Sequence, residues 1–464
     1  MSPHLVSIVV YSTVLVLLGA VIGRWVRTTG AFFVAGRNLG PVLLFSTLLA
    51  ANIGAGSTVG AAALGYSRGL SAWWWVGSAG IGTLALGWWV GPRIWRVAKE
   101  HDLQTVGDLL ELRYGSAVRF VVSSLLWVGT LFVLAAQLLA VARVLEAVAG
   151  VPKTWGCLMG GVVMTAYFTA GGLLSSAWVN LVQLAVLGIG FVIAVPVALG
   201  SIGGLAAIDP IRLDVWEGGV PAARYVALLV PAFIVSPGLL QKVYGARDER
   251  TVRLAVSLAG FALLLFAFLP PLLGMVARVH FPELSSDDLA LPTLLVERMP
   301  LALGSLGLAA IFSAEVSSAD AILFMLATSL ARDLYGRFLR PSAGDAEVLR
   351  VARFAAVAGG LLGIGIALLF ESVIQTLSIF YALLSVSLFV PVVASLHSRN
   401  VGRAHAFAAI LTGVPVLVAT HLLTGGRGLG IANPTLLGLV ASALGFFAIA
   451  ARKSLRRRRG FADR

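Results

Sequence analysis

The stretch Ser313-Ala314-Glu315-Val316-Ser317-Ser318-Ala319-Asp320 lies in the middle of an apolar segment, residues 301–331, that is long enough to span a bilayer. A carboxylate near the bilayer midplane costs roughly 2.5 to 3.5 kcal/mol on insertion scales, so it normally faces a protein cavity and marks an ion or proton path. At about 100° per residue, Ala314, Ser317 and Ser318 share one helix face, and Glu315 and Asp320 lie on its flanks. Hydroxyl and carboxylate oxygens suit a hard cation, so the stretch predicts a cation site. A purely structural interpretation stays open, in which the serines bond to their own helix and neighbouring helices satisfy the acids.

The composition of the whole chain is that of a membrane protein. Of 464 residues, 59% are hydrophobic and 12% are charged, and the mean hydropathy is +0.95. A soluble globule of this length needs more polar surface. Apolar runs of about 17 to 25 residues between charged or turn-rich breaks predict an all-α polytopic fold with about thirteen transmembrane helices. These helices are expected near residues 5–23, 40–67, 70–92, 117–149, 153–171, 177–200, 222–244, 252–279, 293–331, 350–370, 373–396, 402–423 and 433–451.

The distribution of basic residues predicts the orientation in the membrane. With the N-terminus outside and alternating spans, most of the 34 Lys and Arg residues fall in the inner segments. Such an excess marks cytoplasmic segments, so the C-terminus is expected in the cytoplasm. The net charge of +13 then reflects topology and does not indicate nucleic-acid binding. The basic tail 452–464 either anchors the last span or touches anionic lipid.

The chain carries no pattern that indicates catalysis. Its single cysteine, Cys157, excludes an intrachain disulfide, and its six histidines show no HExxH or paired spacing for zinc. The glycine-rich pieces lie within or beside membrane segments, where glycine usually serves close helix packing. An enzyme is therefore not expected. A sensor is not expected either, because only a short tail follows the last predicted span.

Two of the predicted helices are interrupted at similar depth. The span 40–67 contains Asn52-Ile53-Gly54-Ala55-Gly56, and the span 222–244 contains Val235-Ser236-Pro237-Gly238. Backbone groups freed by such breaks are tolerated in a membrane only where they line a cavity or bind something. Interrupted helices at corresponding positions of two five-helix halves indicate an inverted-repeat transporter whose site lies at the midplane.

Several motifs of the chain resemble the sodium:solute symporter family. They are Phe32-Phe33-Val34-Ala35-Gly36-Arg37, the break from Ala50 to Gly60, Gln241-Lys242 with Ala246-Arg247-Asp248, and Ala314-x-x-Ser317-Ser318 running on to Asp333-Leu334-Tyr335. The resemblance covers roughly residues 30–400, and the motifs occur in the family's order. It implies a LeuT-type fold of two inverted five-helix repeats, each beginning with a broken helix. It also implies sodium-coupled symport of a small organic solute by alternating access.

The resemblance implies a division of the chain into six parts. These are an accessory helix with the first cytoplasmic loop (1–39), the first repeat (40–200), an extracellular loop (201–221), the second repeat (222–397), two accessory helices (398–451) and the basic cytoplasmic tail (452–464). Short loops and a bare basic tail favour the inner membrane of a bacterium.

The resemblance also implies a sodium site, carried over residue by residue. Its ligands would be the backbone carbonyls of Ala50, Ile53 and Ala314 and the hydroxyls of Ser317 and Ser318, and all five positions match. Neutral oxygens suit weak, reversible binding of Na⁺. The resemblance implies that sodium stabilises the outward-facing arrangement and that its loss to the cytoplasm allows inward opening.

The carboxylates depart from the family pattern. Many members carry Trp-x-Asp-x-x-Gln entering the sixth span, where this chain has Asn180 in place of the acid, while Asp320 appears beyond Ser317. We hypothesise a second cation or proton site formed from Asp320, Glu315, Ser313 and Asn180. Glu315 alternatively meets a cationic solute group or an embedded arginine. The alternative function is a proton-coupled symporter of the same fold that uses Glu315 and Asp320.

Residues expected to line the solute site come from both breaks and from the spans beside them. They are Asn52, Gly54, Ser57, Thr58, Trp74 within the run Trp73–Trp75, Phe233, Ser236 and Tyr381. Each also has a packing explanation, and the tryptophan run suits an interfacial aromatic belt. Positive helix ends at Gly54 to Ser57 favour a small carboxylate or an amino acid.

Overall fold

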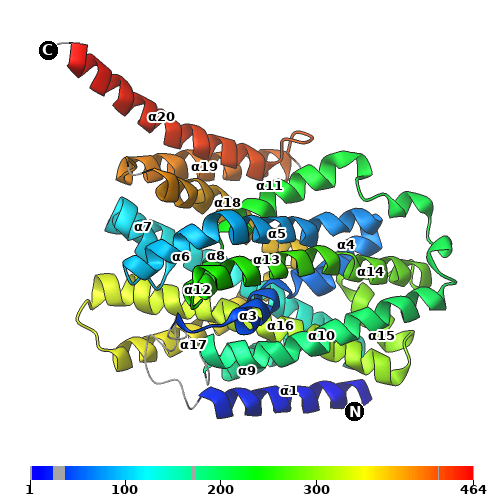
Figure 1. Cartoon of the computed structure of the whole chain (residues 1–464). Helices are drawn as coiled ribbons and strands as arrows, with labels where there is room; N and C mark the ends of the chain where they lie inside the picture. Colours follow the sequence, from blue (N-terminus) through cyan, green and yellow to red (C-terminus); the bar gives the residue numbers. More distant parts are fainter. Residues whose placement is uncertain (1–2, 24–36, 170–172, 399, 427, 463–464) are drawn as a thin grey trace.

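A computed structural model describes residues 3–23, 37–169, 173–398, 400–426 and 428–462. The motif Phe32 to Gly36 lies outside the described residues, as do the side chains of Asp320 and of the basic tail. The described chain is all-helical, with most helices running side by side along one direction (Figure 1). Within these described ranges, eight helices are long and apolar enough to cross a membrane, and one bent helix pair makes a ninth. Shorter apolar helices, Pro3–Val14 and Pro434–Ile449, lie near the two ends of the chain. The predicted polytopic all-α fold is therefore confirmed.

The first part of the chain forms one long series of helices that ends at Ser201. They are α1 (Pro3–Gly23), α3 (Pro41–Asn52), η2 (Gly56–Gly60), α4 (Ala61–Arg68), η3 (Gly69–Ala72), α5 (Trp73–Ala85), η4 (Leu86–Val90), α6 (Gly91–Glu100), α7 (Val106–Tyr114), α8 (Ser116–Ala149), α9 (Lys153–Thr169) and α10 (Leu173–Ser201).

The second part begins with short turns and continues with longer helices. They are η5 (Leu205–Ala207), η6 (Pro210–Leu213), η7 (Glu217–Gly219), α11 (Val220–Val235), α12 (Pro237–Tyr244), α13 (Glu249–Phe266), α14 (Leu269–His280), η8 (Asp287–Leu289), α15 (Ala290–Glu297), α16 (Leu301–Thr328), η9 (Ser329–Leu339), α17 (Asp345–Leu369), α18 (Val373–His397), α19 (Arg403–Thr424) and α20 (Pro434–Ala462).

Two predicted helix boundaries are wrong. The expected helix 293–331 is two helices, α15 and α16, because Pro300 adopts an extended backbone (ψ 143°) and disfavours helix at the residue before it. The helix α16 then continues beyond residue 331 as the π-helix η9, up to Leu339. The expected helix 70–92 continues through α6 to Glu100.

Both predicted breaks are present, and they differ in size. After α3 ends at Asn52, Ile53 is extended (φ −104°, ψ 102°), and the helix axis bends by 63° before continuing from Gly56. Between α11 and α12 only Ser236 leaves the helical region (φ −54°, ψ 120°), followed by Pro237, which has no N–H to donate. Residues 221–244 consequently remain a single span.

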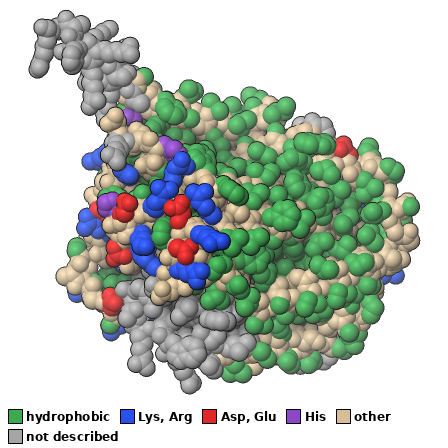
Figure 2. All heavy atoms as spheres, in the orientation of Figure 1, with side chains coloured by type: hydrophobic (Ala, Val, Ile, Leu, Met, Phe, Trp, Pro, Cys, Tyr) green, Lys and Arg blue, Asp and Glu red, His purple; other side chains and the backbone are tan. Residues whose placement is uncertain are grey.

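The helix that carries the serines is the most deeply buried of the spans. The apolar part of α16 is 100% buried, whereas that of the peripheral helix α19 is 28% buried. Figure 2 shows hydrophobic side chains over the middle of the molecule and Lys and Arg gathered at the end where α6 and α7 lie in Figure 1. This arrangement leaves an apolar surface for lipid and places α16 at the centre of the bundle.

The two interrupted helices are joined at one end by backbone hydrogen bonds. The N–H of Leu39, just before α3, donates to the carbonyl of Gly245 (3.0 Å), and the N–H of Arg247 donates to the carbonyl of Leu39 (3.2 Å). These bonds tie the start of the first interrupted helix to the end of the second. The halves α3 and α12 are therefore held together beside the central helix α16.

Candidate functional site

The structure brings together the five oxygens predicted for the sodium site. The Ser318 Oγ lies 3.3 Å from the Ala50 carbonyl oxygen and 3.1 Å from that of Ile53. The Ser317 Oγ lies 3.2 Å from the Ala50 oxygen and 3.1 Å from the Ala314 oxygen. Each hydroxyl has one proton to donate, so neither can satisfy two carbonyls at once. Five neutral oxygens thus converge where the first break meets α16.

The backbone of the first break is held by neighbouring polar groups. The Ala55 N–H donates to Oε1 of Gln137 on α8 (2.8 Å), and the Ser57 hydroxyl donates to the Asn52 carbonyl (2.9 Å). A Cβ added at Gly54 would lie 2.2 Å from the Ser318 Oγ, so only glycine lets the two elements approach this closely. Sequence reasoning missed Gln137. Its signal was a lone amide in the long apolar run of α8.

Glu315 is fully buried beside the first break. Its Oε1 accepts a hydrogen bond from the Thr58 hydroxyl (2.8 Å), and its Oε2 has no partner within the described residues. In that part of the chain no Lys or Arg forms an ion pair with Glu315, so the suggested embedded arginine is not found there. A buried carboxylate without a cationic partner is costly, which makes the bond from Thr58 important for stability.

The other residues of the hypothesised second site have separate partners. Ser313 on α16 hydrogen-bonds with Tyr11 of α1, and the Asn180 side-chain amide donates to the Thr47 hydroxyl (3.3 Å). Neither contact is shared with Glu315, and the side chain of Asp320 lies outside the described residues. The described contacts therefore do not join these residues into one site.

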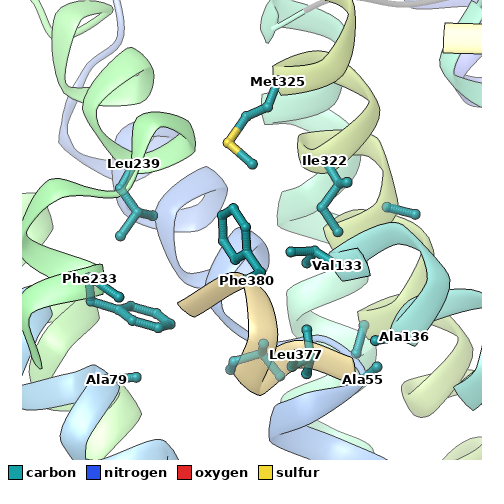
Figure 3. Packing of buried hydrophobic residues seen from close by; sticks show 14 of the residues in the cluster. Ala55, Ala79, Val133, Ala136, Phe233, Leu239, Ile322, Met325, Leu377 and Phe380 are labelled. Carbon is teal, nitrogen blue, oxygen red and sulfur yellow. The ribbon is translucent and has the colours of Figure 1, made fainter. Parts of the chain in front are cut away.

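A cavity of about 70 Å³ opens beside the first break. This volume exceeds the roughly 10 to 15 Å³ that one water needs, so the cavity has room for several small groups. Figure 3 shows Phe233 and Leu239 on one side of this space, Ile322 and Met325 of α16 on the other, and Phe380 between them. Six of the predicted solute residues line the cavity, namely Asn52, Gly54, Ser57, Phe233, Ser236 and Tyr381.

Two predicted solute residues, Thr58 and Trp74, do not line the cavity. The Thr58 hydroxyl faces Glu315, as described above. The Trp74 indole N–H donates to the Val215 carbonyl (3.0 Å), and its ring packs on Trp216 (5.0 Å between centroids). The next residue, Trp75, lines the cavity instead, because one residue turns a helix by about 100°.

The cavity wall is aromatic on one side, and its described lining residues are uncharged. Tyr381 packs against Phe380 (5.3 Å between centroids), Phe233 (5.5 Å) and Trp75 (6.1 Å). No Lys, Arg, His, Asp or Glu is among its described lining residues. Ser318 lines the cavity as well, so its side chain is part of both the predicted sodium site and the cavity wall.

A buried ion cluster braces the end of α16 that leads into η9. Arg119 of α8 pairs with Asp333 (2.6 Å), Glu111 (2.8 Å) and Asp108 (2.9 Å). Burial opposes ionisation of Glu111, but hydrogen bonds from Arg337 and Arg119 hold the pKa of Glu111 below its usual range. The motif around Asp333 thus has a structural role, fastening η9 to α7 and α8.

A helical bundle whose buried central helix meets a broken helix, with a cavity at that junction, is typical of a membrane transporter. The family model for the sodium:solute symporter family matches residues 32–413. The chain therefore belongs to the sodium:solute symporter family. It is a transporter and not an enzyme, and sodium is its coupling ion.

Individual relatives agree with this assignment. The chain is 27% identical over 372 residues to the sodium/pantothenate symporter of Escherichia coli strain K12, covering 73% of each chain. It is 24% identical over 395 residues to the sodium/glucose cotransporter of Vibrio parahaemolyticus, covering 72% of this chain and 70% of the relative. The human high affinity choline transporter 1 is 24% identical over 398 residues, covering 80% of this chain and 68% of the relative.

A solved structure supports the fold. The substrate-bound, outward-open structure of a Na⁺-coupled sialic acid symporter superposes with a TM-score of 0.82 at 15% identity and covers 96% of each chain. The LeuT-type architecture expected from the sequence is confirmed by this similarity.

Proposed function

We propose that the protein carries a small carboxylate or amino acid into the cell together with sodium by alternating access. The observation that supports this most directly is the convergence of the Ala50, Ile53 and Ala314 carbonyls on the Ser317 and Ser318 hydroxyls. Bound Na⁺ would replace hydrogen bonds that the two hydroxyls cannot all make at once. Neutral ligands leave the ion weakly held, so that it can be released inside the cell.

The proposed solute class rests on the cavity. The relatives named above are called symporters or transporters of pantothenate, glucose and choline, so family membership leaves the class open. The cavity meets the start of α12, where Gly238 and Leu239 line it and the helix N-terminus carries partial positive charge. Without charged side chains in its described lining, the cavity would balance a carboxylate by this helix end and by the nearby sodium.

The proposed setting is the bacterial inner membrane, with the N-terminus outside and the C-terminus in the cytoplasm. The basic end of the molecule in Figure 2, where α6 and α7 lie, would face the cytoplasm according to the positive-inside rule. The predicted division into two inverted repeats, 40–200 and 222–397, is consistent with an interrupted helix at the start of each.

The test of the sodium site is thermal stability of the purified protein across a sodium titration at constant ionic strength. Potassium and choline serve as ion controls, and the variant is Ser317→Ala/Ser318→Ala. A matched control is Ser387→Ala/Ser395→Ala, because those serines are also buried but bond only to their own helix, α18. The proposal expects a sodium-specific rise in melting temperature that disappears only in the first variant.

The same measurement separates the rival function. A strong pH effect without any sodium effect would favour the proton-coupled symporter that uses Glu315 and Asp320. In sodium buffer, monocarboxylates and amino acids are then compared with a hexose as stabilising solutes. Stabilisation by the hexose alone would contradict the proposed solute class.

A further inference from the structure

Gln137 stands between the first break and the cavity. It is 3% exposed on α8, and its Oε1 accepts the Ala55 N–H at 2.8 Å. That N–H belongs to the turn where the chain resumes helix after the break, and within the described residues it has no backbone acceptor. A free backbone N–H in a membrane costs several kcal/mol by order of magnitude. The Gln137 side chain therefore supplies the partner that the interrupted helix lacks.

The hydrogen bond between the Ala55 N–H and Gln137 lies next to one of the carbonyl oxygens of the proposed sodium site. The carbonyl of Ile53 and the N–H of Ala55 belong to consecutive peptide planes that share the Cα of Gly54. Because each plane is rigid, fixing the second plane leaves only the two dihedral angles of Gly54 to set the direction of the first.

Gln137 and Ser318 converge on Gly54. A Cβ added at Gly54 would lie 2.2 Å from the Ser318 Oγ and 2.9 Å from the Gln137 Oε1. Ser318 contacts the Ile53 carbonyl, and both Gln137 and Ser318 line the cavity. The peptide that would present the Ile53 carbonyl to sodium is therefore held by α16 through Ser318, and the next peptide is held by α8 through Gln137.

We propose that Gln137 is a positioning residue that aims the Ile53 carbonyl at the sodium site and transmits sodium occupancy to the solute cavity. The inference rests on the proposed sodium site. When sodium draws the Ile53 carbonyl toward itself, the next peptide plane turns, and Gln137, bonded to that plane, shifts in the cavity wall. Without Gln137 the break samples other conformations, and sodium binds only the fraction that is competent.

Three substitutions at Gln137 test whether its hydrogen bond, and not only its packing, is needed for sodium binding. Gln137→Leu removes the acceptor, and Gln137→Asn keeps an amide but withdraws it by one methylene. Gln137→Glu keeps an oxygen at the position of Oε1. The sodium concentration for half-maximal stabilisation is expected to rise about tenfold in the Leu and Asn variants, the loss of about one buried hydrogen bond. The Glu variant should stay within about threefold of the wild type or bind sodium more tightly.

The matched control lies on the same helix. Thr130→Val removes a buried hydroxyl that bonds only to the Leu126 carbonyl of α8 (2.6 Å), and sodium binding should be unchanged. If the Leu and Asn variants bind sodium like the wild type, the positioning role is wrong. If the wild type itself shows no sodium-specific stabilisation, the sodium site fails instead, so the two failures are distinct.

Transmission to the cavity is tested by the reactivity of a cysteine placed in the wall. Ser236→Cys is made in a Cys157→Ala background, since Cys157 is the only native cysteine. The rate at which a small methanethiosulfonate forms a mixed disulfide with the introduced thiol, releasing methanesulfinate, is measured in detergent with sodium or choline. Sodium should change the labelling rate several-fold with Gln137 or Gln137→Glu, and not with Gln137→Leu. A parent whose labelling ignores sodium, or a Leu variant that still responds to it, would overturn the proposed transmission.

Discussion

The two interrupted helices differ in how much of the chain leaves the helix and in which groups the described contacts engage. At the first break, three residues leave the helix, the axis bends by 63°, and the carbonyls of Ala50 and Ile53 face the hydroxyls of α16. At the second break only Ser236 leaves the helix, and the N-terminus of α12 begins at once beside the cavity.

The difference follows from what interrupts each helix. Glycine at the first break has no Cβ, so α16 can approach the chain closely there. Proline at the second break removes one N–H but keeps φ near the helical value, so the helix resumes after one residue. Partial negative charge suits a cation and partial positive charge suits an anion. The carbonyls of the first break support the proposed sodium site, and the N-terminus of α12 beside the cavity supports the proposed carboxylate.

The largest effect is expected from a methyl group at the first break. In Gly54→Ala the new Cβ would lie 2.2 Å from the Oγ and 2.6 Å from the Cβ of Ser318, so α3 and α16 must separate. Sodium-dependent stabilisation should be lost, as measured by a sodium titration of melting temperature. Gly40→Ala is the matched control at the start of the same helix, because nothing lies within 4 Å of its added Cβ. Normal sodium binding by Gly54→Ala would contradict the close approach of the two helices.

The stability of the protein is expected to depend on pH through a buried carboxylate, Asp288. This residue lies in η8, just before α15, and packs against the first interrupted helix near α4 and η2. Its carboxylate accepts the N–H of Val373 at the start of α18 (2.9 Å). Burial raises the pKa of Asp288 to about 6 from 3.8, despite the bond from Val373 and the charge of Arg143. The folded state therefore holds this proton more tightly than the unfolded chain does.

Stability should consequently fall as the pH rises from about 4 to about 6, by up to about 3 kcal/mol at 1.36 kcal/mol per pKa unit. Asp288→Asn keeps an acceptor for Val373 and removes the charge, so its melting temperature should exceed that of the wild type above pH 6 and depend less on pH. An exposed acid of the same loop provides the control, Glu283→Gln, which should keep the wild-type profile. Identical profiles for wild type and Asp288→Asn would refute the assignment.

An intermediate effect is expected at the contact between the first break and Glu315. Thr58→Val removes the only described hydrogen bond of the buried carboxylate and should cost about 1 to 3 kcal/mol of stability, seen as a lower melting temperature without sodium. Thr58→Ser should restore most of the loss, and Thr130→Val reports the cost of losing a hydroxyl bonded to its own helix. Equal losses in the two valine variants would show that Thr58 does not support Glu315.

The smallest effect is expected from a methyl group at the second break. In Gly238→Ala the added Cβ would meet the sulfur of Met325 at 2.9 Å, and this flexible side chain can move aside. The expected cost is below about 1 kcal/mol, with sodium half-saturation within about twofold of the wild type. A loss as large as that of Gly54→Ala would remove the distinction between the two breaks.

Much of the proposed sodium site can be located from the sequence because its parts are local. The helix period placed Ala314, Ser317 and Ser318 on one face, and glycine and proline marked both breaks along the chain. The choice of Trp74 as a lining residue was wrong, since Trp75 takes that place. An apolar run does not define how a buried helix is rotated about its own axis. The sequence therefore does not show which of the neighbouring tryptophans faces the cavity.

The amino-acid sequence by itself determined that the chain crosses a membrane many times, which helices are interrupted and which polar groups lie within the apolar segments. These properties follow from hydropathy, backbone stereochemistry and helix period, which act over a few residues. Only the tertiary structure decided that Ser317 meets the carbonyl of Ala50, 267 residues earlier, that Thr58 faces Glu315 and that Gln137 holds Ala55. Such pairs depend on how the helices pack and rotate against one another, and no local pattern encodes that arrangement.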